Sequence, residues 1–106
     1  MATAANLEDT IEKGLAHLRE RIRIEAAYLF GSQLTGEADE NSDIDLAIFS
    51  PDVDGLNLVE RVNLTSELAL GCDSGLELHL YPSKALANAR PTNFVGYIVS
   101  HGKRLV

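Results

Sequence analysis

The chain begins with an apolar pattern that repeats with the period of a helix. Leucine and isoleucine recur every three or four residues, at Leu7, Ile11, Leu15, Leu18 and Ile22. This spacing places the apolar side chains in one stripe along an α-helix and the polar side chains on its other side. The pattern therefore predicts an amphipathic first helix whose apolar stripe packs against another element.

Three shorter segments have the patterns of β-strands. Residues 26–30 form a continuous apolar run that ends at Gly31, which is typical of a buried strand. Residues 43–49 and 76–81 instead alternate, so each would turn its Ile and Leu side chains to one face and its polar side chains to the other. The polar positions of the two alternating strands are Asp43, Asp45, Glu77, His79 and Tyr81.

Turn-forming residues separate these strands from further helical segments. The apolar positions Leu58, Val59, Val62, Leu68 and Ala69 fit one helix. Ser83 is expected to cap a short helix through Arg90, and Pro91 to begin a last helix that Gly102 ends. The element order predicts an α/β (α+β) fold: a small mixed β-sheet with helices covering one face.

The composition limits the classes of protein that the chain can belong to. Its 106 residues suit a single domain over 1–106, since domains cluster at about 100–150 residues. Sixteen acidic and nine basic residues give a formal charge of -7, which disfavours direct binding to nucleic acid. The single cysteine, Cys72, cannot form an internal disulfide, and no apolar stretch reaches the roughly 18 residues of a bilayer span. We therefore expect a cytoplasmic protein that does not bind membranes.

Three carboxylates are predicted to project from one face of the sheet. If helices cover the apolar faces of both alternating strands, Asp43, Asp45 and Glu77 point to the opposite, open face. Clustered carboxylates repel one another and are stabilised by a cation, and their hard oxygen atoms suit Mg²⁺ that also coordinates phosphates. The two aspartates, separated by one strand residue, therefore predict a magnesium site.

A glycine–serine turn precedes the acidic strand. Gly31 and Ser32 directly follow the first predicted strand. Glycine permits close approach of the backbone, N–H groups at a helix start bind phosphate oxygens, and Ser32 adds a hydroxyl group. Taken alone, such a turn is more typical of an ordinary loop, so its weight depends on the acidic strand downstream.

A competing hypothesis is an EF-hand-like calcium loop formed by Asp39, Asn41, Asp43 and Asp45. It fails at the sixth position of the loop, where Ile44 replaces the required glycine. It also fails at the twelfth, where Ser50 replaces a bidentate glutamate. The calcium hypothesis is therefore set aside.

His79 is predicted to share the open face with Glu77. The other two histidines, His17 and His101, lie far from it along the chain, so no second histidine has metal-ligand spacing. The sequence therefore favours a structural role for His79, with contact to substrate as the alternative.

The turn and the acidic strand together resemble a known signature. Gly31-Ser32, ten intervening residues and then Ser42-Asp43-Ile44-Asp45-Leu46 are similar to the motif of the DNA polymerase β-like nucleotidyltransferase superfamily. The short length resembles its minimal nucleotidyltransferase (MNT) branch. The resemblance implies the polymerase β-like fold, two Mg²⁺ ions held by Asp43 and Asp45, and Glu77 as a third acid. It also implies ATP with its terminal phosphates at Gly31 and Ser32, and in-line attack of an acceptor hydroxyl on the α-phosphorus.

Two features depart from the family pattern. Gln33 and Leu34 stand where many members have a basic residue, so part of the phosphate affinity is expected to be missing or to come from elsewhere. The third acid is Glu77 rather than the commoner aspartate. Asp73 is a less suitable substitute because it lies in the preceding turn.

The resemblance implies a reaction and a partner. The reaction is transfer of a nucleoside monophosphate, AMP from ATP, to a hydroxyl group of a macromolecular acceptor. MNT relatives often act beside a HEPN-domain partner, as antitoxins that adenylylate the toxin, so a HEPN toxin is the expected acceptor. The alternative is a non-catalytic MNT-like antitoxin that neutralises its partner by binding. The sequence leaves the base preference and the oligomeric state open, a homo-oligomer included.

Overall fold

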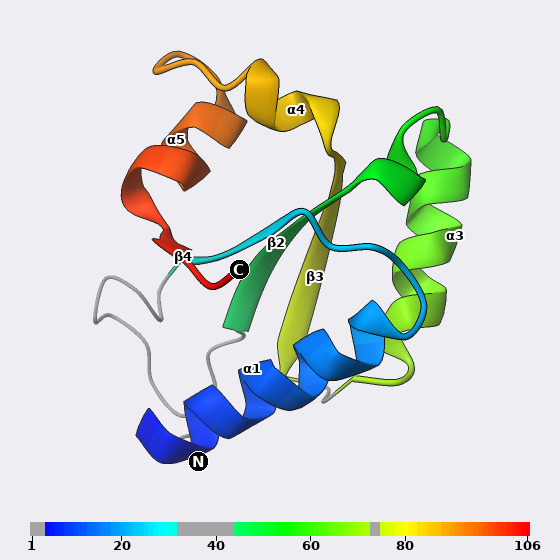
Figure 1. The fold of residues 1–106 in the computed structure, drawn as a ribbon, viewed down its shortest axis with the longest axis vertical. Coiled ribbons are helices and arrows are strands. Elements are labelled where there is room, and N and C mark those ends of the chain that lie inside the picture. The colour runs from blue at the N-terminus through cyan, green and yellow to red at the C-terminus, as the bar shows by residue number, and fades with distance from the viewer. Residues whose placement is uncertain (1–3, 32–43, 73–74) are drawn as a thin grey trace.

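The computed structural model describes residues 4–31, 44–72 and 75–106, which contain one four-stranded sheet (Figure 1). Its strands are β1 (Ala26–Phe30), β2 (Ile44–Ser50), β3 (Leu76–Pro82) and β4 (Lys103–Arg104). They lie in the order β3-β2-β1-β4. Strand β1 is antiparallel to β2 and β4, whereas β2 and β3 are parallel. The sheet is therefore mixed, as predicted.

Two long helices cover one face of this sheet. They are α1 (Ala4–Arg19) and α3 (Leu58–Ala69), which lie beside β3 in Figure 1. The apolar stripe of α1 packs with the Ile and Leu side chains of β2 and β3 in one buried cluster, which includes Ile11, Leu15, Leu18, Leu46, Ile48 and Leu78. The predicted helix-covered face is thus confirmed. Among the described residues, no helix is long and apolar enough to cross a membrane.

The opposite face is open only in part. Helices α4 (Lys84–Ala87) and α5 (Phe94–His101) follow β3, and Ile98 of α5 packs on Tyr28 and Phe49 in a second buried cluster. The sequence predicts that this whole face is open. It is partly covered because Val95, Ile98 and Val99 give α5 an apolar side of its own. At β1 both faces are covered, so all five of its residues are buried, which accounts for its continuous apolar run.

The last two helices begin differently from the prediction. Helix α4 is shorter than expected, and the Ser83 side chain donates to Asp54 Oδ2 at 2.9 Å instead of capping α4. Helix α5 begins after Asn93, whose side chain accepts a hydrogen bond from the Gly96 N–H at 2.7 Å, and not at Pro91. An asparagine oxygen satisfies a free N–H of the first turn, whereas proline is only tolerated there.

Helix α3 lies where the sequence predicts a helix, but it buries a different side. Leu58, Val59 and Val62 are 66%, 68% and 53% exposed, although their spacing is helical. The buried contact is made instead by Leu68 and by the partly buried Leu64. Apolar residues therefore occupy two sides of α3, and periodicity alone did not reveal which side faces the sheet.

Candidate active site

The strand register brings two of the predicted acids together. Asp45 of β2 lies directly opposite Glu77 of the parallel strand β3, and opposite Phe30 of the antiparallel strand β1. Opposite residues on neighbouring strands point to the same face and lie within contact distance. The carboxylates of Asp45 and Glu77 therefore share one corner of the sheet, at the end of β1 and the beginnings of β2 and β3.

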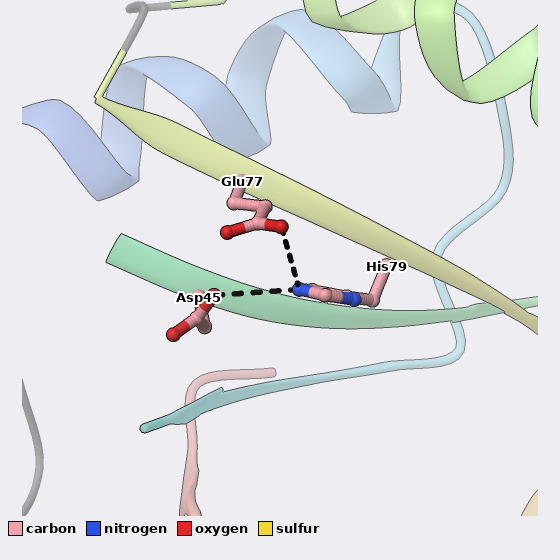
Figure 2. Close-up of side chains that lie close together, drawn as sticks. All are labelled: Asp45, Glu77 and His79. Atoms are coloured by element: carbon pink, nitrogen blue, oxygen red, sulfur yellow. Dashed lines mark hydrogen bonds and ion pairs between the residues drawn. The ribbon is translucent and has the colours of Figure 1, made fainter. Parts of the chain in front are cut away.

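His79 joins these two carboxylates (Figure 2). Its Nε2 atom lies 3.4 Å from Asp45 Oδ1 and 4.0 Å from Glu77 Oε1. One potential ligand atom from each of the three side chains lies within 4.8 Å of the others. The side chain of Asp45 is 22% exposed, that of His79 31% and that of Glu77 54%. We call these three side chains the acidic corner. Its aspartate is mostly buried, whereas its glutamate is largely exposed to solvent.

The backbone of Gly31 lies against the acidic corner. Its φ of +86° is in the left-handed region that side chains rarely adopt. A Cβ atom at this position would overlap Oδ2 of Asp45. Glycine is therefore required here both by the backbone conformation and by the close approach of the carboxylate.

The other predicted site residues cannot be placed in the same way. Ser32 and Asp43 lie outside the described residues, and so do Gln33 and Leu34 of the turn and Asp73, the alternative third acid. Of the sequence-predicted site, the described structure brings together Gly31, Asp45 and Glu77.

The sequence favours a structural role for His79, because no second histidine has metal-ligand spacing. The geometry, however, places His79 among the carboxylates. Its partners are instead an aspartate on the neighbouring strand and a glutamate two positions earlier. The signal that could have found it is the alternation of β3, which puts His79 on the same face as Glu77.

Tyr81 is the next residue on this face of β3 and lies beyond the acidic corner. Its ring stacks on Phe49, with centroids 5.2 Å apart and planes at 21°. Burial raises the pKa of the Tyr81 phenol, and the positive charge of Arg61 opposes this shift. The phenol is therefore neutral near pH 7, and Tyr81 is a half-buried aromatic residue.

A shallow groove on the outer side of β3 adjoins the acidic corner only at His79. It has a volume of about 290 Å³ and lies between α3 and the edge of β3, lined by residues that include Arg61, Thr65 and Tyr81. His79 contacts both regions, but Asp45 and Glu77 do not line the groove. It therefore does not extend the acidic site.

The donor atoms of the acidic corner fit a divalent cation. Two carboxylates at matched positions of adjacent strands repel each other unless a positive charge lies between them. Their oxygen atoms are ligands that Mg²⁺ and Mn²⁺ prefer, and half-burial of Asp45 reduces competition from water. The beginning of β2 can thus hold a metal beside the Gly31 backbone, where phosphate groups can approach.

Comparison with known protein sequences agrees with this interpretation. The family model described as Polymerase beta, Nucleotidyltransferase matches residues 12–106. The chain is also similar to Protein adenylyltransferase MntA of Shewanella oneidensis, at 39% identity over 62 residues. That match covers 58% of this chain and 43% of the relative, so the chain spans less than half the length of that protein.

Comparison with solved structures supports the same family. A toxin–antitoxin complex with AMP-PNP contains a chain that is 30% identical, with a TM-score of 0.57, over 90% of this chain and 71% of the other. A chain of the MntA–HepT toxin–antitoxin is 26% identical, with a TM-score of 0.54, over 93% and 71%. A putative nucleotidyltransferase of Sulfolobus solfataricus, at 17% identity and a TM-score of 0.55 over 83% and 81%, shows the fold alone. Since the family model extends over residues 12–106 and includes every described residue of the acidic corner, the chain belongs to the polymerase beta nucleotidyltransferase family, as a minimal nucleotidyltransferase (MNT) domain.

Proposed function

We propose that this chain is a Mg²⁺-dependent nucleotidyltransferase that transfers AMP from ATP to a hydroxyl group of a protein partner. The observation that carries the proposal is the pairing of Asp45 and Glu77 on adjacent strands beside the Gly31 backbone. In a chain of this family, that arrangement supports a site for a cation and for the phosphates of a nucleotide. Residues 1–106 are proposed to form this one domain.

Each residue of the corner has a distinct part in the reaction. Asp45, which His79 and the Gly31 backbone hold in place, binds the cation, and Asp43 is proposed as its companion. Glu77 is proposed to bind the same cation as Asp45. It is also the most exposed of the three side chains, so it is accessible to an incoming hydroxyl and accepts its proton. When bound, the cation stabilises negative charge on the attacking and leaving oxygens.

The proposed reaction replaces one bond to the α-phosphorus of ATP by another. The acceptor oxygen forms a bond to the α-phosphorus of ATP, and the bond between the α-phosphorus and the bridging oxygen to the β-phosphate breaks. Pyrophosphate leaves with that oxygen, and the hydroxyl proton passes to Glu77 and then to water. The Gly31 turn, with the proposed hydroxyl of Ser32, orients the phosphates for this in-line displacement.

The acceptor is proposed to be a HEPN-domain toxin encoded with this chain. Two observations support a protein acceptor. The relative from Shewanella is a protein adenylyltransferase, and two of the three structural relatives named above come from toxin–antitoxin complexes. The net charge of -7 also disfavours a nucleic-acid acceptor, because an acidic surface repels phosphate groups at long range.

Transfer of label from α-³²P-ATP to the purified partner in the presence of Mg²⁺ tests this function. The native chain is expected to label the partner, and Asp45→Asn is expected to lower the rate at least about a hundredfold because a metal ligand is lost. Asp9→Asn is the matched control. It also removes one negative charge, but from the exposed surface of α1, where Asp9 pairs only with Lys13 among the described contacts.

The labelling experiment, together with an assay of whether the partner is neutralised, distinguishes a catalytic antitoxin from one that only binds its partner. Full labelling by Asp45→Asn would contradict the assignment of the site. If no label transfers and Asp45→Asn still neutralises the partner, the chain is a non-catalytic antitoxin. The replacement of the usual basic residue by Gln33 and Leu34 favours that second function.

A further inference from the structure

The acidic corner contains a nitrogen donor in addition to its carboxylates. In Figure 2 the imidazole of His79 points between Asp45 and Glu77, with Nε2 as the atom that faces both. It reaches this position because His79 follows Glu77 by two residues on β3 and lies opposite Ala47 of β2. The small side chain of Ala47 leaves space above β2 for the ring.

The separations between the donor atoms suit ligands of a single ion. Around an octahedral ion with bonds of about 2.1 Å, adjacent ligands lie about 3.0 Å apart and opposite ligands about 4.2 Å apart. The Nε2 atom of His79 is 3.4 Å from Asp45 Oδ1 and 4.0 Å from Glu77 Oε1. Both distances lie within this interval. All three donor atoms lie within 4.8 Å of one another, slightly beyond its upper end, so one ion can contact all three side chains after rotations that bring the two carboxylates closer.

Neighbouring rings restrict the imidazole to this position. The ring of Phe30 meets that of His79 edge-on, with centroids 5.1 Å apart and planes at 61°. Phe30 is itself 8% exposed and meets Phe94 of α5 at 5.8 Å. The His79 ring is thus held between a buried aromatic side chain and the carboxylates, and little entropy is lost when it binds an ion.

We propose that Nε2 of His79 is a direct ligand of the catalytic cation, so that the site binds Mn²⁺ in preference to Mg²⁺. This inference rests on the proposed function, which places a cation at Asp45 and Glu77. Both ions prefer carboxylate oxygen, but Mn²⁺, as a transition-metal ion, binds an imidazole nitrogen more strongly than the harder Mg²⁺ does. A site with one nitrogen and two carboxylates should therefore show a larger difference in affinity between Mn²⁺ and Mg²⁺ than a site made of carboxylates alone.

Calorimetric titration of the full chain with MnCl₂ and with MgCl₂ tests the proposal. The measured quantity is the ratio of the Kd for Mg²⁺ to the Kd for Mn²⁺ in the native chain and in His79→Gln. Glutamine places an amide oxygen near the position of Nε2, so it replaces the nitrogen donor by an oxygen donor. We expect the native chain to bind Mn²⁺ more tightly, and the ratio to fall at least about tenfold in the variant.

His101→Asn is the matched control. It removes a histidine of α5 that stacks on Tyr97 and lies outside the acidic corner, so the ratio should not change. If His79→Gln does not fold, as judged by circular dichroism, His79→Asn is titrated in its place with the same expectation.

Two results would overturn the proposal: a native chain with no preference for Mn²⁺, or an unchanged ratio in the His79 variant. An unchanged ratio that comes from an equal loss of affinity for both ions would make His79 a positioning residue that acts through Asp45. Failure here is distinguishable from failure of the proposed function. Label transfer with an unchanged ratio removes only the His79 inference, whereas a lowered ratio without label transfer removes only the reaction.

Discussion

The two faces of the sheet differ in how completely they are covered. Under α1 and α3, side chains such as Leu18, Leu46 and Ile48 have no exposed surface. On the other face, α5 buries Ile98 and the centre of the sheet, yet the side chains of the acidic corner are 22–54% exposed. We infer that the first face supplies most of the stability. One corner of the second face carries polar groups, for which we propose a role in binding a cation and a nucleotide.

Leu46→Ala is expected to have the largest effect on stability. The residue is fully buried in the apolar cluster of the first face, and removing such a side chain lowers the free energy of unfolding by about 2–5 kcal/mol. Urea denaturation measures the loss. Leu70→Ala is the control; Leu70 is 88% exposed, so its replacement should change stability by less than about 0.5 kcal/mol.

The same variant tests whether the stability of the first face and the activity of the second are independent. Label transfer per folded molecule should stay near the native value in Leu46→Ala, because its side chain points away from the acidic corner. A loss of activity much larger than the loss of folded protein would show that the two faces are not separable in this way.

Gly31→Ala and Gly55→Ala form a matched pair with a smaller expected effect. Both glycines have a left-handed φ, of +86° and +85°, so alanine should lower the free energy of unfolding by about 1–2 kcal/mol at either position. A Cβ at Gly31 meets Asp45, whereas a Cβ at Gly55 meets nothing within 4 Å. Only Gly31→Ala should therefore weaken binding of Mg²⁺ and ATP, measured by calorimetry. Equal binding by both variants would contradict the contact with Asp45.

The smallest expected effect concerns the single cysteine. Burial raises the pKa of the Cys72 thiol, which packs against the cluster of the first face. The reactive thiolate is therefore scarcer at pH 8 than in an ordinary cysteine, and its fraction grows as the pH rises toward the raised pKa. Alkylation by iodoacetamide should be slower in the native chain than in the chain unfolded in urea. Similar rates in both would show that Cys72 is not shielded.

The strands of the site could be predicted because their patterns are local. The first strand was predicted at 26–30 and is found there, and the alternating strands at 43–49 and 76–81 are found at 44–50 and 76–82. Within each strand, side-chain alternation places the acidic residue on the face opposite to the Ile and Leu side chains. Asp45 and Glu77 therefore share a face when the apolar sides of both strands pack under the same helices. The proximity of these two carboxylates therefore followed once the two strands were taken as neighbours.

Features that depend on long-range packing could not be predicted. Strand β4 contains only Lys103 and Arg104, and it exists because β1 offers an unpaired edge. The position of α5 over the second face depends on contacts of Ile98 with β1 and β2 that no local pattern encodes. The inclusion of His79 in the acidic corner depends on the register between β2 and β3, which periodicity does not fix.

The central claim is that the acidic corner binds a cation together with a nucleotide. Calorimetric titration of ATP into the native chain and into Asp45→Asn, with and without Mg²⁺, tests it most directly. The account predicts that tight ATP binding requires Mg²⁺, and that Asp45→Asn weakens it at least about tenfold while leaving the melting temperature of the free chain nearly unchanged. ATP binding of equal strength without Mg²⁺, or in Asp45→Asn, would contradict the account.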